Sequence, residues 1–259
     1  MKKLLLFILF LVLTVVTQIG GFALILARIT SKKIKRSWAF IPLFAGWYLF
    51  LSVVLTPPLA KIFGREKITV NDNITPTSVW TVVLNRNYVT PKLNEALQDI
   101  ANDLPGDLQL SYLDACFPFV NGFPLLPHLS HNDGKKIDIS FMYVTPENVT
   151  TNLKPSRSGY GVFEVPRENE LDQNTRCKSQ GYWQYDYSKF LTFGTPHDDL
   201  KFSNERTKTL LISILNHPNI EKIFIEPHLK NRLNLQSQKV RFHGCGAVRH
   251  DDHIHIQTN

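Results

Sequence analysis

Residues 136–144 have the sequence KIDISFMYV, in which polar and apolar side chains alternate over the first six positions. A period of two residues is typical of a β-strand that is buried on one face. The three apolar side chains of this alternation are expected to face the core, which places Asp138 and Ser140 together on the opposite face. The sequence therefore predicts a strand with a carboxylate on its polar face.

A second alternating stretch lies close to the C-terminus. Residues 253–257, HIHIQ, predict a strand on which His253 and His255 share one face, with Ile254 on the other. A buried carboxylate or imidazole without a partner costs several kcal/mol. The polar faces of these two strands are therefore expected to satisfy each other.

Helices and further strands surround these two stretches. Thr90 and Pro91 are typical of an N-cap and a first helical position, and they begin a predicted helix that ends before Pro105. The other predicted elements are strands at 78–84, 108–116, 220–225 and 240–243, the last pairing with the C-terminal strand, and a helix at 205–215. This order predicts an α+β fold with a small antiparallel sheet and flanking helices.

Residues 145–200 show no clear period and contain Pro, Asn and Ser followed by an aromatic patch. A stretch of this length without strong elements is typical of a functional loop or an insertion. We expect the aromatic side chains at 182–193 to pack in the interior, and the alternative is that they form a wall of a substrate cleft.

The first 60 residues contain two apolar runs, at 4–27 and 37–60, each of 24 residues without a charge. A transmembrane helix needs about 20 apolar residues, so both runs predict membrane spans. Residues 28–36, between the runs, hold five basic side chains. We therefore predict a membrane anchor at 1–60 with two transmembrane helices, a linker at 61–77, and a domain at 78–259 with an insertion at about 145–200.

The formal net charge of +7 by itself suggests a nucleic-acid partner. All of the excess lies in residues 1–60, which contain seven basic and no acidic side chains, whereas residues 61–259 contain 22 of each. The charge therefore indicates contact with a lipid bilayer through residues 4–27 and 37–60 and no nucleic-acid partner. Because basic loops stay in the cytoplasm, the domain is expected to face the periplasm or cell exterior from the inner (cytoplasmic) membrane.

A cleaved signal peptide is the alternative for the first run, because Lys2 and Lys3 precede it. Cleavage would place the basic cluster outside and direct the second helix inward, against the positive-inside bias. The cysteines do not decide the compartment, since Cys116, Cys177 and Cys245 allow either one disulfide with a leftover thiol or three thiols.

Nine histidines occur, and five of them lie in two short motifs. His128-x2-His131-x6-Asp138 ends in the first predicted strand, and His250-x2-His253-x-His255 ends in the second. Each motif alone is weak, because such spacings arise by chance. Both together, each at a strand, indicate a metal site. The remaining histidines are expected to be structural or solvated: His197, His217, His228 and His243.

A catalytic zinc has three protein ligands, nitrogen or oxygen, and leaves its fourth position to water. His131, Asp138 and His255 would supply that set. His253, two positions away on the same strand face, would stand beside the water. The expected cofactor is therefore Zn²⁺.

The two motifs resemble those of the lysostaphin-type and D-alanyl-D-alanine zinc metallopeptidases, and most of all those of the penicillin-insensitive murein endopeptidase family. That family has His-x2-His-x6-Asp early in its domain and His-x2-His-x-His near its C-terminus. Residues 220–233, IEKIFIEPHLKNRL, also resemble the strand and proline that precede the last motif of that family. By order of elements the resemblance covers residues 78–259.

The resemblance implies the same three zinc ligands, with His128 in or next to the ligand shell. It also implies that His253, with His250 near it, acts as the base and stabilises the transition state. The implied activity is that of a murein D,D-endopeptidase or carboxypeptidase, which hydrolyses a D-amino-acid peptide bond. Its partners would be the peptide stems of peptidoglycan, and the oligomeric state is not predicted.

Two other functions match parts of the pattern. His253-Ile-His255-Ile-Gln257 resembles the His-x-His-x-Gln core of nucleotidyl transferases, in which a histidine attacks a phosphate. That function leaves the first motif without a role. A non-enzymatic wall-binding module that keeps zinc for stability would instead need a site closed by four protein ligands, with His128 as the fourth.

Overall fold

The computed structural model describes residues 2–259 and divides them into two compact units, each made of several stretches of chain. The first unit runs to Ile68 and includes residues 80–91 and 115–134. The second unit comprises residues 69–79, 92–114 and 135–259. The domain boundaries predicted at residues 60 and 77 stay predictions.

Helices make up most of the first unit. Many large apolar side chains on them are exposed, among them Phe7 at 58% and Ile41 at 75%. The elements are α1 (Lys2–Thr17), α2 (Gly20–Ile34), η1 (Ser37–Ala39), α3 (Phe40–Phe50), η2 (Leu51–Leu55), α4 (Thr56–Ile62), nearly all of α5 (Val79–Val83), and the paired strands β1 (Glu66–Lys67) and β3 (Tyr88–Val89).

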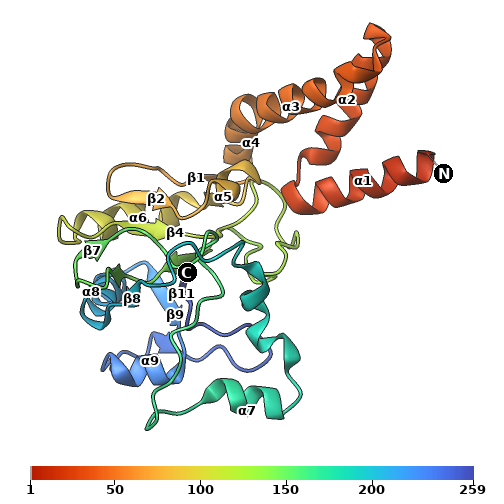
Figure 1. Ribbon diagram of the computed structural model, residues 1–259. Coiled ribbons are helices and arrows are strands. Elements are labelled where there is room, and N and C mark those ends of the chain that lie inside the picture. Colours follow the sequence, from red (N-terminus) through yellow and green to blue (C-terminus); the bar gives the residue numbers. More distant parts are fainter. Residues whose placement is uncertain (1) are drawn as a thin grey trace. The chain divides into compact units, whose positions relative to one another are not determined.

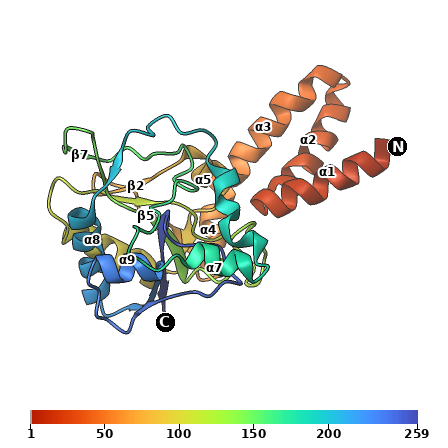
Figure 2. The same ribbon diagram turned by 60° about the horizontal axis from the view of Figure 1, so that its bottom comes forward.

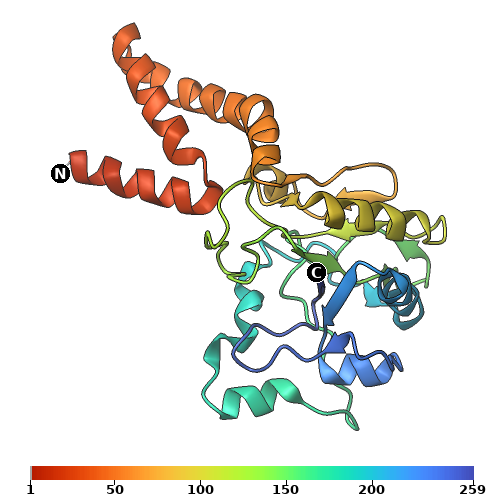
Figure 3. The same ribbon diagram turned by 180° about the vertical axis from the view of Figure 1, so that it is seen from behind.

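The prediction of two transmembrane helices is wrong for the first apolar run. Residues 4–27 do not form one helix, because the chain turns sharply between α1 and α2 (Figures 1 and 3). Gln18 at the turn has a φ of 65°, and Gly20 and Gly21 follow it. A Cβ at Gly21 would lie 2.2 Å from the Thr14 hydroxyl, so the close approach of α2 to α1 requires glycine. The hydropathy of a sequence does not indicate where the backbone reverses direction, so it did not predict this turn.

Among residues 2–259, one helix is long and apolar enough to cross a membrane, by length and composition. It covers Phe40–Ile62 and consists of α3, η2 and α4 in direct succession. The middle element, η2, is a π-helical turn, which interrupts the regular α-helical hydrogen bonds. There Lys67 donates to the Ser52 carbonyl, and Asn85 donates to the Ser52 hydroxyl, both at 3.3 Å. The second predicted span therefore forms as a helix, interrupted by one π-helical turn.

The core of the second unit is a six-stranded sheet with the order β10-β9-β11-β5-β4-β2. The two stretches of alternating side chains, β5 and β11, form its central pair, and Figures 1 and 2 show this sheet beside α8 and α9. The three inner pairings are antiparallel, and the two outer ones are parallel. The strands are β2 (Ile74–Pro76), β4 (Leu110–Tyr112), β5 (Lys136–Ser140), β9 (Ile220–Phe224), β10 (Val240–Arg241) and β11 (His253–Thr258).

A smaller antiparallel sheet has the order β7-β6-β8. It consists of β6 (Tyr143–Val144), β7 (Thr150–Thr151) and β8 (Lys201–Phe202). The fold is thus mixed α/β with small antiparallel sheets and helices, and the predicted combination of helices with a mainly antiparallel sheet is confirmed at this level.

Both predicted helices of the second unit are confirmed. The helix that begins at Pro91 is α6 (Pro91–Asn102), and it buries Leu93 and Leu97 along one face. The helix predicted at 205–215 is α8 (Asn204–Asn216), whose N-cap Ser203 accepts from a backbone amide. The other helices are α7 (Gln173–Ser179), η3 (Trp183–Leu191) and α9 (Pro227–Arg232).

Two strand predictions are wrong. Residues 78–84 contain the helix α5, although their β-branched side chains favour a strand. Asn85, two residues after the end of this helix, has a left-handed φ of 56°. Residues 240–241 do not pair with the C-terminal strand, because β5 and β9 occupy both edges of β11. β10 therefore pairs with β9 instead.

The prediction that the aromatic patch at 182–193 packs in the interior is also wrong for most of its members. Tyr185 is buried, but Trp183 is 74% exposed and Phe190 is 69% exposed. The η3 helix directs only some of these aromatic side chains to the interior. Because the sequence of this segment has no clear period, it does not indicate which of them are buried.

Gly21→Ala is expected to lower the melting temperature of the full chain in detergent, measured by circular dichroism. The added methyl group would overlap Thr14 and Phe10, and such overpacking costs about 1–3 kcal/mol. Gly46→Ala is the matched control, because a Cβ at Gly46 would have no neighbour within 4 Å. Equal melting temperatures for the two variants would contradict the close packing of α1 on α2.

Candidate metal centre

The centre of the six-stranded sheet carries the polar faces of the two predicted strands. β5 and β11 are antiparallel, with His255 opposite Asp138 and His253 opposite Ser140. All four side chains are buried. Residues directly opposite each other in a sheet point to the same face, so a carboxylate and two imidazoles line this face. The prediction that these side chains come together is confirmed.

The carboxylate of Asp138 is contacted at both oxygens. Tyr160 donates its hydroxyl to Oδ2 at 2.8 Å, and His255 Nδ1 lies 2.9 Å from Oδ1. His253 Nε2 lies 3.6 Å from Oδ2. The side chain of Asp138 is completely buried, and a buried carboxylate is costly unless polar or charged neighbours satisfy it. These contacts therefore both stabilise and orient it.

A second carboxylate orients His253. Its Nδ1 lies 2.5 Å from Asp252 Oδ1, so Nδ1 donates to this carboxylate and Nε2 is directed toward Asp138. The backbone amide of Gly161 donates to the other oxygen of Asp252 at 2.6 Å. Burial alone would lower the pKa of His253, but the carboxylates of Asp138 and Asp252 raise it to about 9.

Aromatic rings surround His255. The ring centroids of His250 and His243 lie 5.7 and 6.0 Å from that of His255, and Phe224 lies 4.3 Å from His243. Burial lowers the pKa of His250 well below its usual value, and the neighbouring His253 and His255 lower it further. His243, which lies outside both motifs in the sequence, joins this cluster because β10 runs beside β9.

The first motif adds a group of buried ligand atoms. A nitrogen of His128, a nitrogen of His131 and a carboxylate oxygen of Asp138 all lie within 4.8 Å of one another. His131 Nδ1 lies 2.8 Å from the Ala115 carbonyl, so Nδ1 donates there and Nε2 carries the lone pair. This buried His-His-Asp group could hold a metal ion.

Besides His243, two residues of the centre were not predicted from the sequence. Tyr160 lies in the insertion without any motif, yet its hydroxyl binds Asp138 and its ring centroid lies 5.1 Å from that of His253. Asp252 orients His253. Its position directly before a motif histidine is the one signal that could have indicated it.

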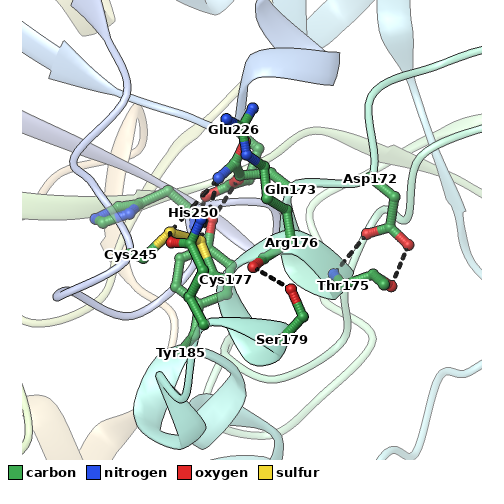
Figure 4. The surroundings of a disulfide bond; sticks show 11 residues. Asp172, Gln173, Thr175, Arg176, Cys177, Ser179, Tyr185, Glu226, Cys245 and His250 are labelled. Atoms are coloured by element: carbon green, nitrogen blue, oxygen red, sulfur yellow. Dashed lines mark hydrogen bonds between the residues drawn. A yellow bond between two sulfur atoms is a disulfide. The ribbon is translucent and has the colours of Figure 1, made fainter.

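Buried polar contacts hold the second motif in place. Arg249 and Asp251 form a buried ion pair through two hydrogen bonds. The backbone amide of His250 donates to Glu226 at 3.0 Å, and Tyr185 donates to the other oxygen of Glu226 at 2.6 Å (Figure 4). Because Tyr185 belongs to η3, the insertion contributes to the support of the motif.

A disulfide joins Cys177 of α7 to Cys245 (Figure 4), and Cys116 is a buried thiol. Of the two alternatives that the cysteine count left open, the structure has the single disulfide with a leftover thiol. The bond links the insertion to the segment that leads into the second motif, across 68 residues of sequence.

The remaining histidines make contacts of other kinds. His217 Nε2 lies 3.3 Å from a carboxylate oxygen of Asp99, and His228 donates to the Glu164 carbonyl at 2.8 Å. His197 is half-buried. None of these contacts involves Asp138 or His255, whereas His243, which the sequence grouped with these three residues, lies beside His255.

A comparison of the chain with models of known protein families found no match, and a comparison with curated proteins found none either.

The ion pairs of Arg232 provide a pH-dependent test of how the insertion is held. Arg232 of α9 pairs with Glu164 and Glu170, and its hydrogen bond to Glu170 lowers the pKa of that carboxyl to about 2. A lowered pKa in the folded state stabilises the fold above the unfolded-state value of about 4.3, and this contribution is lost as the pH falls toward 2. Arg232→Gln is therefore expected to destabilise the chain at pH 7 and to have a smaller effect at pH 3.

Urea unfolding at several pH values measures this difference. Arg167→Gln is the control, because Arg167 is exposed and lies in the same segment as Glu164 and Glu170. A loss of stability in the Arg232 variant that is the same at pH 7 and pH 3 would show that the ion pairs do not cause it.

Proposed function

We propose that the chain is a membrane-anchored, zinc-dependent peptidoglycan hydrolase that cleaves a D-amino-acid peptide bond in murein cross-bridges. The observation that carries this proposal is the buried Asp138 carboxylate, which has His255 on one side and the histidines of the first motif within ligand distance. The types of these ligands and their order along the chain are those of the murein endopeptidase family that the motifs resemble. The substrate would be the peptide stems of peptidoglycan.

The donor atoms favour zinc as the metal. Imidazole nitrogens with one carboxylate oxygen are typical zinc ligands, whereas calcium and magnesium are bound mainly by oxygen. His255 Nδ1 lies 2.9 Å from Asp138 Oδ1, so these two donor groups already lie side by side. His131, Asp138 and His255 would hold the ion, with His128 in or next to the ligand shell.

His253 is the residue to which we assign proton transfer. The chemistry that zinc supplies when bound is polarisation of a carbonyl group and a lower pKa of water. His253 would accept a proton from the attacking water at Nε2, because its Nδ1 already donates a hydrogen bond to Asp252. The protonated ring then stabilises negative charge that develops on the substrate carbonyl oxygen. The negative charge of Asp138 raises the pKa of His253. A cation bound to Asp138 would offset that charge and so lower the pKa of His253 again.

His250 has a supporting role beside His253. Its lowered pKa keeps it neutral, so it adds no second positive charge when the His253 ring, 4.8 Å away between centroids, is protonated. Glu226 fixes its backbone. We therefore assign His250 the positioning of His253 and of the substrate, within the base and transition-state machinery that the resemblance implies.

The proposed location is the inner (cytoplasmic) membrane, with the second unit facing the periplasm or cell exterior. The exposed apolar side chains of α1 to α4 and the apolar helix Phe40–Ile62 support the anchor. The basic residues at 28–36 precede this helix, which favours a cytoplasmic start and an exported end. The disulfide supports an oxidising compartment.

A non-catalytic wall-binding module is the second candidate, and one observation favours it. His128 belongs to the group of ligand atoms within 4.8 Å, so with His255 the chain offers four side chains for a closed site. A closed site leaves no position for water. The nucleotidyl transferase alternative has less support, because it gives the His-His-Asp group no role.

Digestion of purified peptidoglycan by the full chain in detergent tests the proposal. We expect cross-links to be cut, a chelator to abolish the cleavage and added zinc to restore it. His255→Ala is expected to lose both zinc and activity, because it removes a ligand. His253→Ala is expected to keep zinc and to lose activity by about 10²–10⁴-fold, the range for loss of a general base. Elemental analysis of zinc and chromatography of the released fragments are the measurements.

His217→Ala is the matched control, because His217 contacts Asp99 away from the centre. Normal hydrolysis by His253→Ala would refute the assigned mechanism. A wild-type chain that holds zinc and binds peptidoglycan without releasing any fragment would favour the wall-binding module. Release of free D-alanine alone would identify a carboxypeptidase.

A further inference from the structure

We propose that the end of α2 binds the headgroups of anionic phospholipids. Arg28 and Lys32 lie four residues apart on one face of α2, and two further basic residues follow the helix directly, Lys35 as its C-cap and then Arg36. Together with the start of α3 they line a hollow of about 420 Å³, which we name the basic hollow. It is lined by Arg28, Ser31, Lys32, Lys35, Arg36 and Phe40.

The basic hollow has an uncompensated positive charge. Its four basic side chains are exposed, and the first 65 residues contain no Asp or Glu. The C-terminal end of the α2 dipole is equivalent to a negative charge of about half an elementary charge. The two positive charges of Lys32 and Lys33 in the last turn exceed this value. The remaining charge therefore attracts an anion from outside the chain.

Exposed apolar side chains are close in sequence to the residues that line the basic hollow. They are Ile34, Trp38 and Ile41, with Trp38 at 68%. The guanidinium of Arg36 lies 5.9 Å from the Trp38 ring. A phospholipid satisfies both features at once, with its phosphate at the cations and its acyl chains against the apolar side chains. A soluble phosphate would satisfy only the cations, so the occupant that fits is a lipid.

The basic hollow adjoins the start of the apolar helix Phe40–Ile62. Phe40 belongs both to the hollow and to the start of the apolar helix Phe40–Ile62. Bound anionic headgroups would hold that end of the helix at the lipid surface. This inference rests on the proposed membrane anchor and not on the proposed hydrolysis.

Native mass spectrometry of the detergent-purified full chain tests the inference, with phosphatidylglycerol and phosphatidylcholine of equal acyl chains as probes. We expect the apparent affinity for phosphatidylglycerol to be about tenfold or more higher than that for phosphatidylcholine, since each basic residue near an anionic lipid contributes roughly fivefold. The triple variant Lys32→Gln, Lys35→Gln, Arg36→Gln is expected to lose this preference.

The matched control is the triple variant Lys92→Gln, Arg167→Gln, Arg241→Gln, which removes the same charge from exposed positions in the second unit. It is expected to keep the preference. In the wild-type chain, added salt is expected to reduce the preference, because exposed charges are screened. The salt series uses only the wild-type chain, so its result does not depend on whether the variants fold.

Equal binding of the two lipids by the wild-type chain would overturn the inference, and so would a preference that salt or the first triple variant leaves unchanged. Displacement of phosphatidylglycerol by an equal concentration of glycerol phosphate would also overturn it, since the site would then bind a soluble phosphate. Failure of the chain to co-float with vesicles of either lipid would instead contradict the membrane anchor itself.

Discussion

The second unit depends on one buried negative charge. The Asp138 carboxylate is completely buried, and the contacts of Tyr160 and His255 with its two oxygens offset the cost of burying it. This requirement fixes the register of the central strands, since a shift of β11 by one residue would direct Ile254 or Ile256 at the carboxylate in place of His255. The need to satisfy Asp138 therefore selects both the pairing of β5 with β11 and the residues that can share a cation with it.

Segments outside the sheet complete this arrangement. The insertion supplies Tyr160 and the Gly161 amide, which binds the carboxylate that orients His253. It also supplies Tyr185, which supports His250 through Glu226. The insertion is therefore part of the candidate centre and not only a connection between strands.

The periodic elements of this chain could be predicted from its sequence, because their side chains report the face on which they lie. Asp138, His253 and His255 were placed together by strand alternation, and α6 by its apolar stripe. Tyr160 could not be placed at the centre, because it lies in an irregular loop without a periodic pattern. His243 could not be placed there either, because it belongs to no motif and reaches the centre only through the pairing of β10 with β9. The break at Gln18 was missed because hydropathy records composition and not backbone direction.

X-ray absorption at the zinc edge of the full chain, loaded with one zinc ion, tests the central claim most directly. The account predicts nitrogen and oxygen ligands only, at about 2.0–2.2 Å, and loss of imidazole scattering in His255→Ala. A sulfur ligand at about 2.3 Å, or a spectrum that His255→Ala leaves unchanged, would contradict it.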